Sequence, residues 1–174
     1  SLLIGNLGNL INRTLTLAKG VELTKAEATS EIKEKTGQIL IAGEAALSTF
    51  SFKEYVIWVL ALSKYGNEYL SKEEPWFLKD KDKKKFEQIM VNAVYIVLGL
   101  LVLLKPLLPD SYDTLARFLS VDIKKWEDKG KHEYDMEEIL NRLIKKVKIE
   151  EVEPLFNKID EEAIEKERAK IKLT

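Results

Sequence analysis

The chain has 174 residues, of which 45% are hydrophobic and 33% are charged, and its formal net charge is −1. This length suits one domain with a sizeable core, and the apolar fraction excludes disorder along the whole chain. A net charge near zero excludes indiscriminate binding to nucleic acid or to a membrane, so any nucleic-acid contact must be local. The absence of cysteine excludes a disulfide framework and a thiolate zinc site, and it fits a reducing, cytoplasmic compartment.

The first predicted element is an amphipathic helix over about residues 2–19, with Gly20 placed to end it. Its opposite arc is polar and carries glycines, asparagines, Arg13 and Thr16, and no acidic residue occurs before Glu22. A surface that only needed to be soluble would contain both Glu and Lys. This face without acidic residues therefore indicates a binding surface for a polar or anionic ligand. The arc expected to face a core contains Leu3, Ile4, Leu7, Leu10, Ile11, Leu15, Leu17 and Ala18.

Capping patterns predict where the second and third helices begin. The segment TKAE at 24–27 has the spacing of a capping box, so a second helix is expected to start there. A third helix is expected to start within FSFKEY at 50–55, with Phe50 packed against Tyr55 as a hydrophobic staple. Pro75 should break the chain after this third helix.

The fourth predicted helix, over about residues 82–104, contains the one stretch that resembles a membrane segment, AVYIVLGLLVLL at 93–104. This run is much shorter than the roughly 20 residues that a bilayer span needs. It is flanked by the charged segment DKDKKKFEQ and by KPLLPD. We therefore expect a helix buried at the centre of a bundle, and no membrane partner.

A shorter fifth helix is expected after Pro106 and Pro109 and should end near Leu119. Five helices in series predict an all-α fold, a helical bundle of about five core helices. We assign residues 1–121 to this bundle.

The composition changes from residue 122 onward, where more than half of the residues are charged. The segment DMEEILNRLIKKV at 135–147 has apolar residues at helical spacing and predicts an amphipathic helix. A last, almost entirely charged helical stretch is expected at about 160–170. Residues 122–174 are therefore interpreted as a charged C-terminal extension that packs back on the bundle and adds one or two helices.

The residue patterns that catalysis requires are missing. The single histidine, His132, stands in the charged stretch DKGKHEYD with no nucleophile near it. Acidic residues alternate with lysines in solvated helix patterns, which does not favour a metal site. A glycine-rich phosphate loop is absent as well. We expect no catalytic residue, no metal and no cofactor in this chain.

A possible binding site combines two separate parts of the sequence. Asn9 and Arg13 are four residues apart on the polar face of the first helix, so their side chains are neighbours. Trp76 follows Pro75 at a helix break, where an indole often stays half exposed. Taken singly, Trp76 could pack as a lid on the bundle and Arg13 could pair with an acid. Together they offer an aromatic ring on which an unstacked base can stack, and a planar donor and an amide that can hydrogen-bond to its edge.

Three segments carry a resemblance to a known family. LGNLINRTL, NEYLSKEEPW and LLKPLLPDSYDTLARFL, in this order and spacing, closely resemble the anticodon-binding helical domain of methionyl-tRNA synthetase, a class I enzyme. PLFNKIDEEAIEKE at 154–167 resembles the segment that follows this domain. The resemblance implies recognition of the CAU anticodon of tRNA(Met) by Asn9, Arg13 and Trp76, with Pro75 fixing the indole.

The resemblance also implies a parent enzyme that uses ATP and methionine. Its catalytic domain has a His-Ile-Gly-His motif, which one histidine cannot provide, so the chain should be inactive by itself. The implied partners are the anticodon stem-loop of tRNA(Met) and that catalytic domain, with no DNA. The amphipathic stretch at about 133–151 departs from the family pattern and leaves its role open.

Two other functions remain open at this point. The chain could be the anticodon-binding domain of another class I synthetase, since KPLLP recurs among the enzymes for leucine, isoleucine, valine and cysteine. It could also be a helical protein–protein interaction module whose polar face and Trp76 bind a partner helix. Proximity of Asn9, Arg13 and Trp76 would favour the RNA-binding interpretation.

Overall fold

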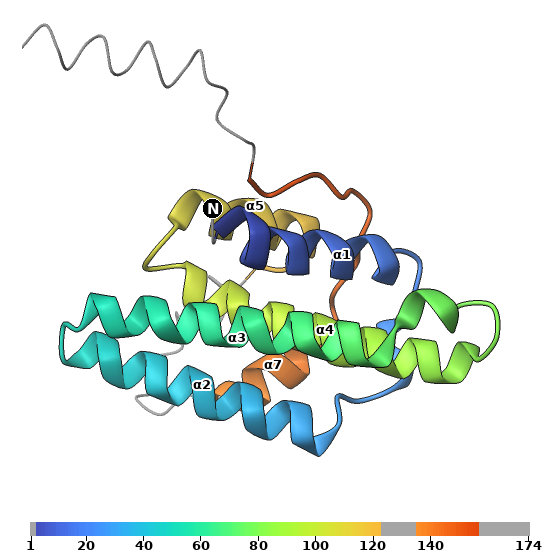
Figure 1. Ribbon diagram of the computed structural model, residues 1–174, viewed down its shortest axis with the longest axis horizontal. Helices are drawn as coiled ribbons and strands as arrows, with labels where there is room; N and C mark the ends of the chain where they lie inside the picture. The colour runs from blue at the N-terminus through green and yellow to red at the C-terminus, as the bar shows by residue number, and fades with distance from the viewer. Residues whose placement is uncertain (1–2, 123–134, 157–174) are drawn as a thin grey trace, which may run out of the picture.

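The computed structural model describes residues 3–122 and 135–156, and every regular element within these ranges is helical (Figure 1). This result confirms the predicted all-α class. The elements are a π-helical turn Leu3–Gly8, α1 Asn9–Ala18, a 3₁₀ turn Leu23–Lys25, α2 Ser30–Ser48, α3 Phe52–Glu73, a 3₁₀ turn Pro75–Phe77, α4 Lys83–Leu104, α5 Pro109–Phe118 and α7 Met136–Ile144.

Helix α4 is the centre of the bundle and contacts α1, α2, α3, α5 and α7. In Figure 1, α1 and α5 lie along one side of the α3–α4 pair, and α2 and α7 lie along the other. The run predicted to be buried, residues 93–104, is buried except for the half-buried Val102, and the buried stretch begins earlier, at Ile89. Helix α4 is long and apolar enough to cross a membrane by length and composition, but 83% of its most apolar window is buried inside the protein.

Two glycines allow the helices to approach closely. A Cβ atom at Gly66 of α3 would lie 2.5 Å from Cδ2 of Leu10 in α1. A Cβ atom at Gly99 of α4 would lie 2.7 Å from Cγ2 of Thr36 in α2. A contact below 3.0 Å requires a neighbour to shift, so glycine at these sites lets α1 and α2 pack this closely without displacing Leu10 or Thr36.

Helix α2 begins at Ser30, not at the capping-box pattern of 24–27. The reason is tertiary. The Oδ1 atom of Asn92, a buried amide on α4, accepts a hydrogen bond of 2.9 Å from the backbone N–H of Thr29. Gln88, one turn earlier on α4, donates to the carbonyl of Glu27 at 2.8 Å. These bonds hold residues 27–29 against α4, and the helix starts after them.

The predicted hydrophobic staple at the start of α3 is wrong, although the helix does begin within 50–55. Phe50 is 83% exposed and has a φ of 56°, so its ring does not pack on the bundle. Tyr55 is buried instead against α4, where its hydroxyl donates to the carbonyl of Leu103 at 2.7 Å. A local pattern could not anticipate that this tyrosine has a long-range partner.

The amphipathic segment predicted at 135–147 forms α7, which packs against α4 and α2. Its N-cap is Asp135, whose carboxylate accepts from the backbone N–H groups of Glu137 and Glu138. The division of the chain into residues 1–121 and 122–174 stays a prediction. His132 and the helix expected at 160–170 lie outside the described residues.

Candidate nucleic-acid interface

Helix α1 presents the predicted polar face to the outside. Leu10, Ile11 and Leu15 are buried against the bundle, whereas Asn9 is exposed and Arg13 is partly exposed. This division follows the apolar periodicity of the segment. The structure therefore confirms which face of α1 is available to a ligand.

The π-helical turn that precedes α1 is fixed to α3 by a hydrogen-bond network that the sequence analysis did not find. The Oδ1 atom of Asn6 accepts hydrogen bonds from Ser63 Oγ at 2.9 Å and from Asn67 Nδ2 at 2.8 Å. Asn67 Nδ2 also donates to the backbone carbonyl of Asn6 at 2.9 Å. In the sequence Asn6 looks like the neighbouring asparagines, so only its distant partners distinguish it.

The second part of the site is the sharp turn that follows α3. Glu74 has φ 46° and ψ 54°, a left-handed conformation that a residue before proline rarely adopts. Pro75 is buried, and Trp76 directly after it is 39% exposed. The backbone N–H of Phe77 donates to Glu74 O at 3.0 Å, which closes the turn. Burial of the proline and the closed turn together hold the indole outward.

The two parts of the site meet in space. The guanidinium carbon of Arg13 lies 5.0 Å from the centroid of the Trp76 ring, a cation–π distance, although 63 positions separate them. Within the described residues Arg13 forms no ion pair with a carboxylate, which removes the alternative that it pairs with an acid. Trp76 is 39% exposed, which agrees with the half-exposed indole expected after Pro75.

Asn9 lies one helical turn before Arg13 on the same face of α1. Its side chain is exposed, and in the part of the chain that the structure describes its amide makes no hydrogen bond. The structure thus brings Arg13 and Trp76 together, while Asn9 lies one helical turn from Arg13 and Pro75 directly precedes Trp76. Whether these four residues contact RNA stays a prediction.

The surroundings of this site are rich in positive charge. Five lysines occur in residues 79–85, directly after the turn that carries Trp76, and all are exposed. Lys83 and Lys85 make long ion pairs of 3.9 Å with Glu87 and 3.7 Å with Glu73. Asp80 and Asp82 lie among these lysines, so residues 79–85 carry a formal charge of +3, although the net charge of the chain is −1.

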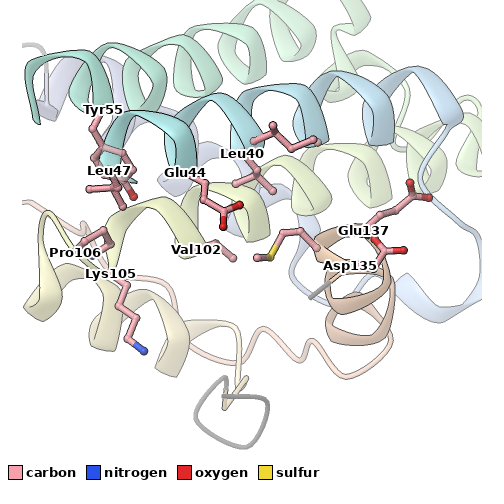
Figure 2. Close-up of a pocket in the computed structure, with 12 residues that line it drawn as sticks. Leu40, Glu44, Leu47, Tyr55, Val102, Lys105, Pro106, Asp135 and Glu137 are labelled. Atoms are coloured by element: carbon pink, nitrogen blue, oxygen red, sulfur yellow. Dashed lines mark hydrogen bonds between the residues drawn. The ribbon is translucent and has the colours of Figure 1, made fainter. Parts of the chain in front are cut away.

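A separate cavity of about 460 Å³ lies between α2, α4 and the start of α7 (Figure 2). Its walls are mainly apolar, and the carboxylates of Glu44, Asp135 and Glu137 lie beside it. Asp135 is already engaged as the N-cap of α7. None of the four predicted site residues lines this cavity, and we assign it no ligand. Within 3–122 and 135–156, no three His, Cys, Asp or Glu side chains are grouped to hold a metal ion.

A helical bundle that exposes an indole beside a guanidinium has the groups that nucleic-acid-binding proteins use to hold an unstacked base. Comparison with known families agrees with this class. Residues 19–172 match the family described as the anticodon binding domain of methionyl tRNA ligase. The chain belongs to this family. The matched range includes Pro75 and Trp76 and leaves out Asn9 and Arg13.

Individual relatives extend the similarity over nearly the whole chain. A methionine–tRNA ligase of Methanopyrus kandleri is 37% identical over 170 residues, covering 96% of this chain and 24% of that protein. One of Bacillus cereus is 30% identical over 173 residues, covering 97% and 29%. One of Methanosarcina mazei is 28% identical over 169 residues, covering 93% and 22%. The chain thus spans about a quarter of the length of these relatives.

Proposed function

We propose that this chain recognises the first base of a CAU anticodon, cytosine, through Trp76, Arg13 and Asn9, with Pro75 fixing the indole. The observation that carries the proposal is the 5.0 Å approach of the Arg13 guanidinium to the Trp76 ring on an exposed face. The family of the chain supports anticodon binding in general, and the chemistry of these side chains supports cytosine in particular.

The edge of cytosine complements the three side chains. Cytosine has an amino donor next to two acceptors on its Watson–Crick edge. The carbonyl of an asparagine accepts from the amino group, and a guanidinium donates to the acceptors. Stacking of one base on an aromatic ring contributes about 1–3 kcal/mol. A carboxylate beside Asn9 and Arg13 would repel the approaching phosphates, which agrees with the absence of acidic residues before Glu22.

Binding requires a small local rearrangement. In the free protein Arg13 covers one face of the Trp76 ring, and this contact is worth about 0.5–1 kcal/mol at an exposed site. When a base stacks on that face, the guanidinium moves to the rim of the indole and its N–H groups reach the edge of the base. The cation–π contact keeps both groups close to their bound positions before RNA arrives.

The broader role follows from the relatives, which are methionine–tRNA ligases. We propose that the chain acts as the part of such an enzyme that selects tRNA(Met), while a catalytic domain elsewhere in the parent protein uses ATP and methionine. Contacts of that parent with the rest of the tRNA would add affinity to the anticodon contacts.

The experiment is a titration of the 174-residue chain with a CAU stem-loop and with loops in which the cytosine is replaced. We expect the replacement to weaken binding by about 1–3 kcal/mol. Arg13→Ala and Trp76→Ala should each weaken binding to the CAU loop by a similar amount, because each removes a group that contacts the cytosine. Both variants should discriminate much less between loops.

Two further variants serve as controls. Arg13→Lys keeps the positive charge and removes the planar guanidinium with its pair of N–H donors. It should therefore discriminate between matched and mismatched loops as poorly as Arg13→Ala. Lys19→Ala removes an exposed charge at the end of α1 and should weaken all loops alike, with a smaller salt dependence. Equal binding of matched and mismatched loops by the unmodified chain would contradict the proposal and favour a protein-interaction bundle.

A further inference from the structure

A second exposed aromatic ring stands next to Trp76, and the proposed cytosine contacts do not use it. Phe77 is 59% exposed, although it lies between the buried Pro75 and Leu78, which packs against the core. The turn that carries Phe77 is closed by hydrogen bonds from Phe77 N to Glu74 O and from Leu78 N to Pro75 O, both 3.0 Å. The turn therefore holds the Phe77 ring outside the core, in contact with water.

The relative orientation of the two rings limits what they can bind. The centroids of the Trp76 and Phe77 rings are 6.1 Å apart, and their planes meet at 62°. Consecutive bases in a stacked RNA strand are nearly parallel. Bases stacked on rings inclined by 62° cannot be parallel, so the pair accepts two neighbouring bases only when these are no longer stacked on each other.

The charge beyond Phe77 suits the strand that would connect two such bases. Lys79, Lys81 and Lys84 are exposed and take part in no ion pair among the described residues. They follow the aromatic turn directly in the chain with Asp80 and Asp82 among them, and residues 79–85 keep a net positive charge that attracts the phosphates of a bound strand. A basic segment beside exposed aromatic rings is the combination that single-stranded nucleic acid binds.

We infer that Phe77 is a second stacking plate, which receives the base adjacent to the one on Trp76, so that the loop binds with these two bases splayed apart. This inference rests on the proposed function, because it needs an RNA loop at Trp76. It adds a positioning residue for the second anticodon base, adenine, whose large ring system offers the greatest stacking area to a phenyl ring.

The test is a double-mutant cycle between Phe77 and the second anticodon base. Phe77→Leu keeps an apolar side chain and removes the aromatic face, and an abasic second position removes the base. We expect Phe77→Leu to bind the intact CAU loop roughly 5- to 150-fold more weakly, the range typical of one lost base stack. The abasic loop has no base that could stack on Phe77. Phe77→Leu and the unmodified chain should therefore bind the abasic loop equally.

Matched controls separate stacking from other effects. Phe77→Tyr keeps the ring and should bind the intact loop like the unmodified chain. Phe77→Leu should keep its thermal unfolding midpoint, since the ring is mostly exposed. It should also keep the preference for cytosine at the first position, because Trp76, Arg13 and Asn9 remain.

Two results would overturn the inference and leave the proposed function standing. One is full affinity of Phe77→Leu for the intact loop while Trp76→Ala loses affinity. The other is an equal loss with intact and abasic loops, which would mean that Phe77 only supports Trp76. Full affinity of both Phe77→Leu and Trp76→Ala would instead contradict the proposed function itself.

Discussion

Phe50 lies two residues after the end of α2 and has a left-handed backbone conformation, with a φ of 56°. The backbone N–H of Ser51 donates to Ala46 O at 2.8 Å, and that of Phe50 donates to Leu47 O at 2.9 Å. This pair of bonds is a Schellman motif, whose left-handed position favours glycine because a Cβ atom crowds the following carbonyl. The ring is 83% exposed, so little packing offsets the strain.

Replacing this residue should stabilise the protein. The left-handed conformation costs a residue with a side chain about 1–2 kcal/mol, which glycine avoids. Glycine also has greater conformational freedom in the unfolded chain, and this reduces the gain in stability by roughly 0.5–1 kcal/mol. Phe50→Gly is therefore expected to raise the free energy of unfolding by about 0.5–1 kcal/mol in chemical denaturation. Phe50→Ala, which keeps the strain, should match the unmodified chain. A Gly variant no more stable than the Ala variant would show that the motif is not strained.

At the scale of elements, the position of α1 depends on Gly66 of α3. A Cβ atom there would lie 2.5 Å from Leu10 Cδ2 in α1 and 3.1 Å from Ile96 Cγ2 in α4. Both neighbours are fully buried and cannot turn away easily. Because α1 carries Asn9 and Arg13, the absence of a side chain at this position helps to set the distance between Arg13 and Trp76.

Gly66→Ala should therefore affect both stability and binding. The extra methyl group overfills the contact at a cost of about 1–3 kcal/mol, and the higher helix propensity of alanine offsets up to about 1 kcal/mol of this loss in the free energy of unfolding. It should also weaken binding of the CAU loop, because a shift of α1 moves Arg13 relative to Trp76. Both quantities can be measured by denaturation and by titration at a temperature where the variant is folded.

Gly37→Ala on α2 is the matched control. A Cβ atom there meets no atom within 4 Å. This variant should gain up to about 1 kcal/mol from helix propensity and bind the loop normally. If Gly66→Ala is as stable as Gly37→Ala, the close approach of α1 and α3 does not limit the fold.

At the scale of the whole molecule, neutral phenol groups lie inside the bundle. Burial raises the pKa of Tyr55 to about 12 and that of Tyr69 to about 12. Burial also raises the pKa of Tyr95, with a further contribution from Glu137 and Asp135 of α7. Burial disfavours the charged form of each phenol, so these groups are neutral in the packed bundle at ordinary pH.

The stability of the bundle should consequently fall in alkali. The pKa of Tyr55 is raised in the folded protein above its ordinary value of 10.0, so its contribution is complete below pH 10 and is lost as the pH rises towards 12. The loss is up to about 1.4 kcal/mol per pH unit for this one group. Tyr55→Phe should show a flatter decline of the free energy of unfolding over this interval.

The same variant has a cost at neutral pH. Phe at position 55 leaves Leu103 O without the 2.7 Å hydrogen bond and should lower stability there by about 1 kcal/mol. An alkaline decline as steep in Tyr55→Phe as in the unmodified chain would contradict the assignment to this tyrosine.

The sequence by itself determined the features that depend on neighbouring residues. The apolar spacing of residues 10–18 and of 93–104 predicted the buried face of α1 and the central helix α4. Helix α4 begins at Lys83, directly after the capping Asp82 and close to the expected start, whereas α5 begins at Pro109 and not after it, because proline fits the first position of a helix. The amide, the guanidinium and the indole could also be identified as candidates from the sequence, because their chemistry is local.

Only the tertiary structure decided the features that join distant segments. The approach of Arg13 to Trp76, the anchoring of Asn6 by α3 and the late start of α2 at Ser30 each depend on partners far away in the chain. Local propensity contributes a few tenths of a kcal/mol per residue, whereas a buried polar group without a partner costs about 1–3 kcal/mol. Buried groups such as Asn92 therefore override the local pattern, and their partners are chosen when the helices pack.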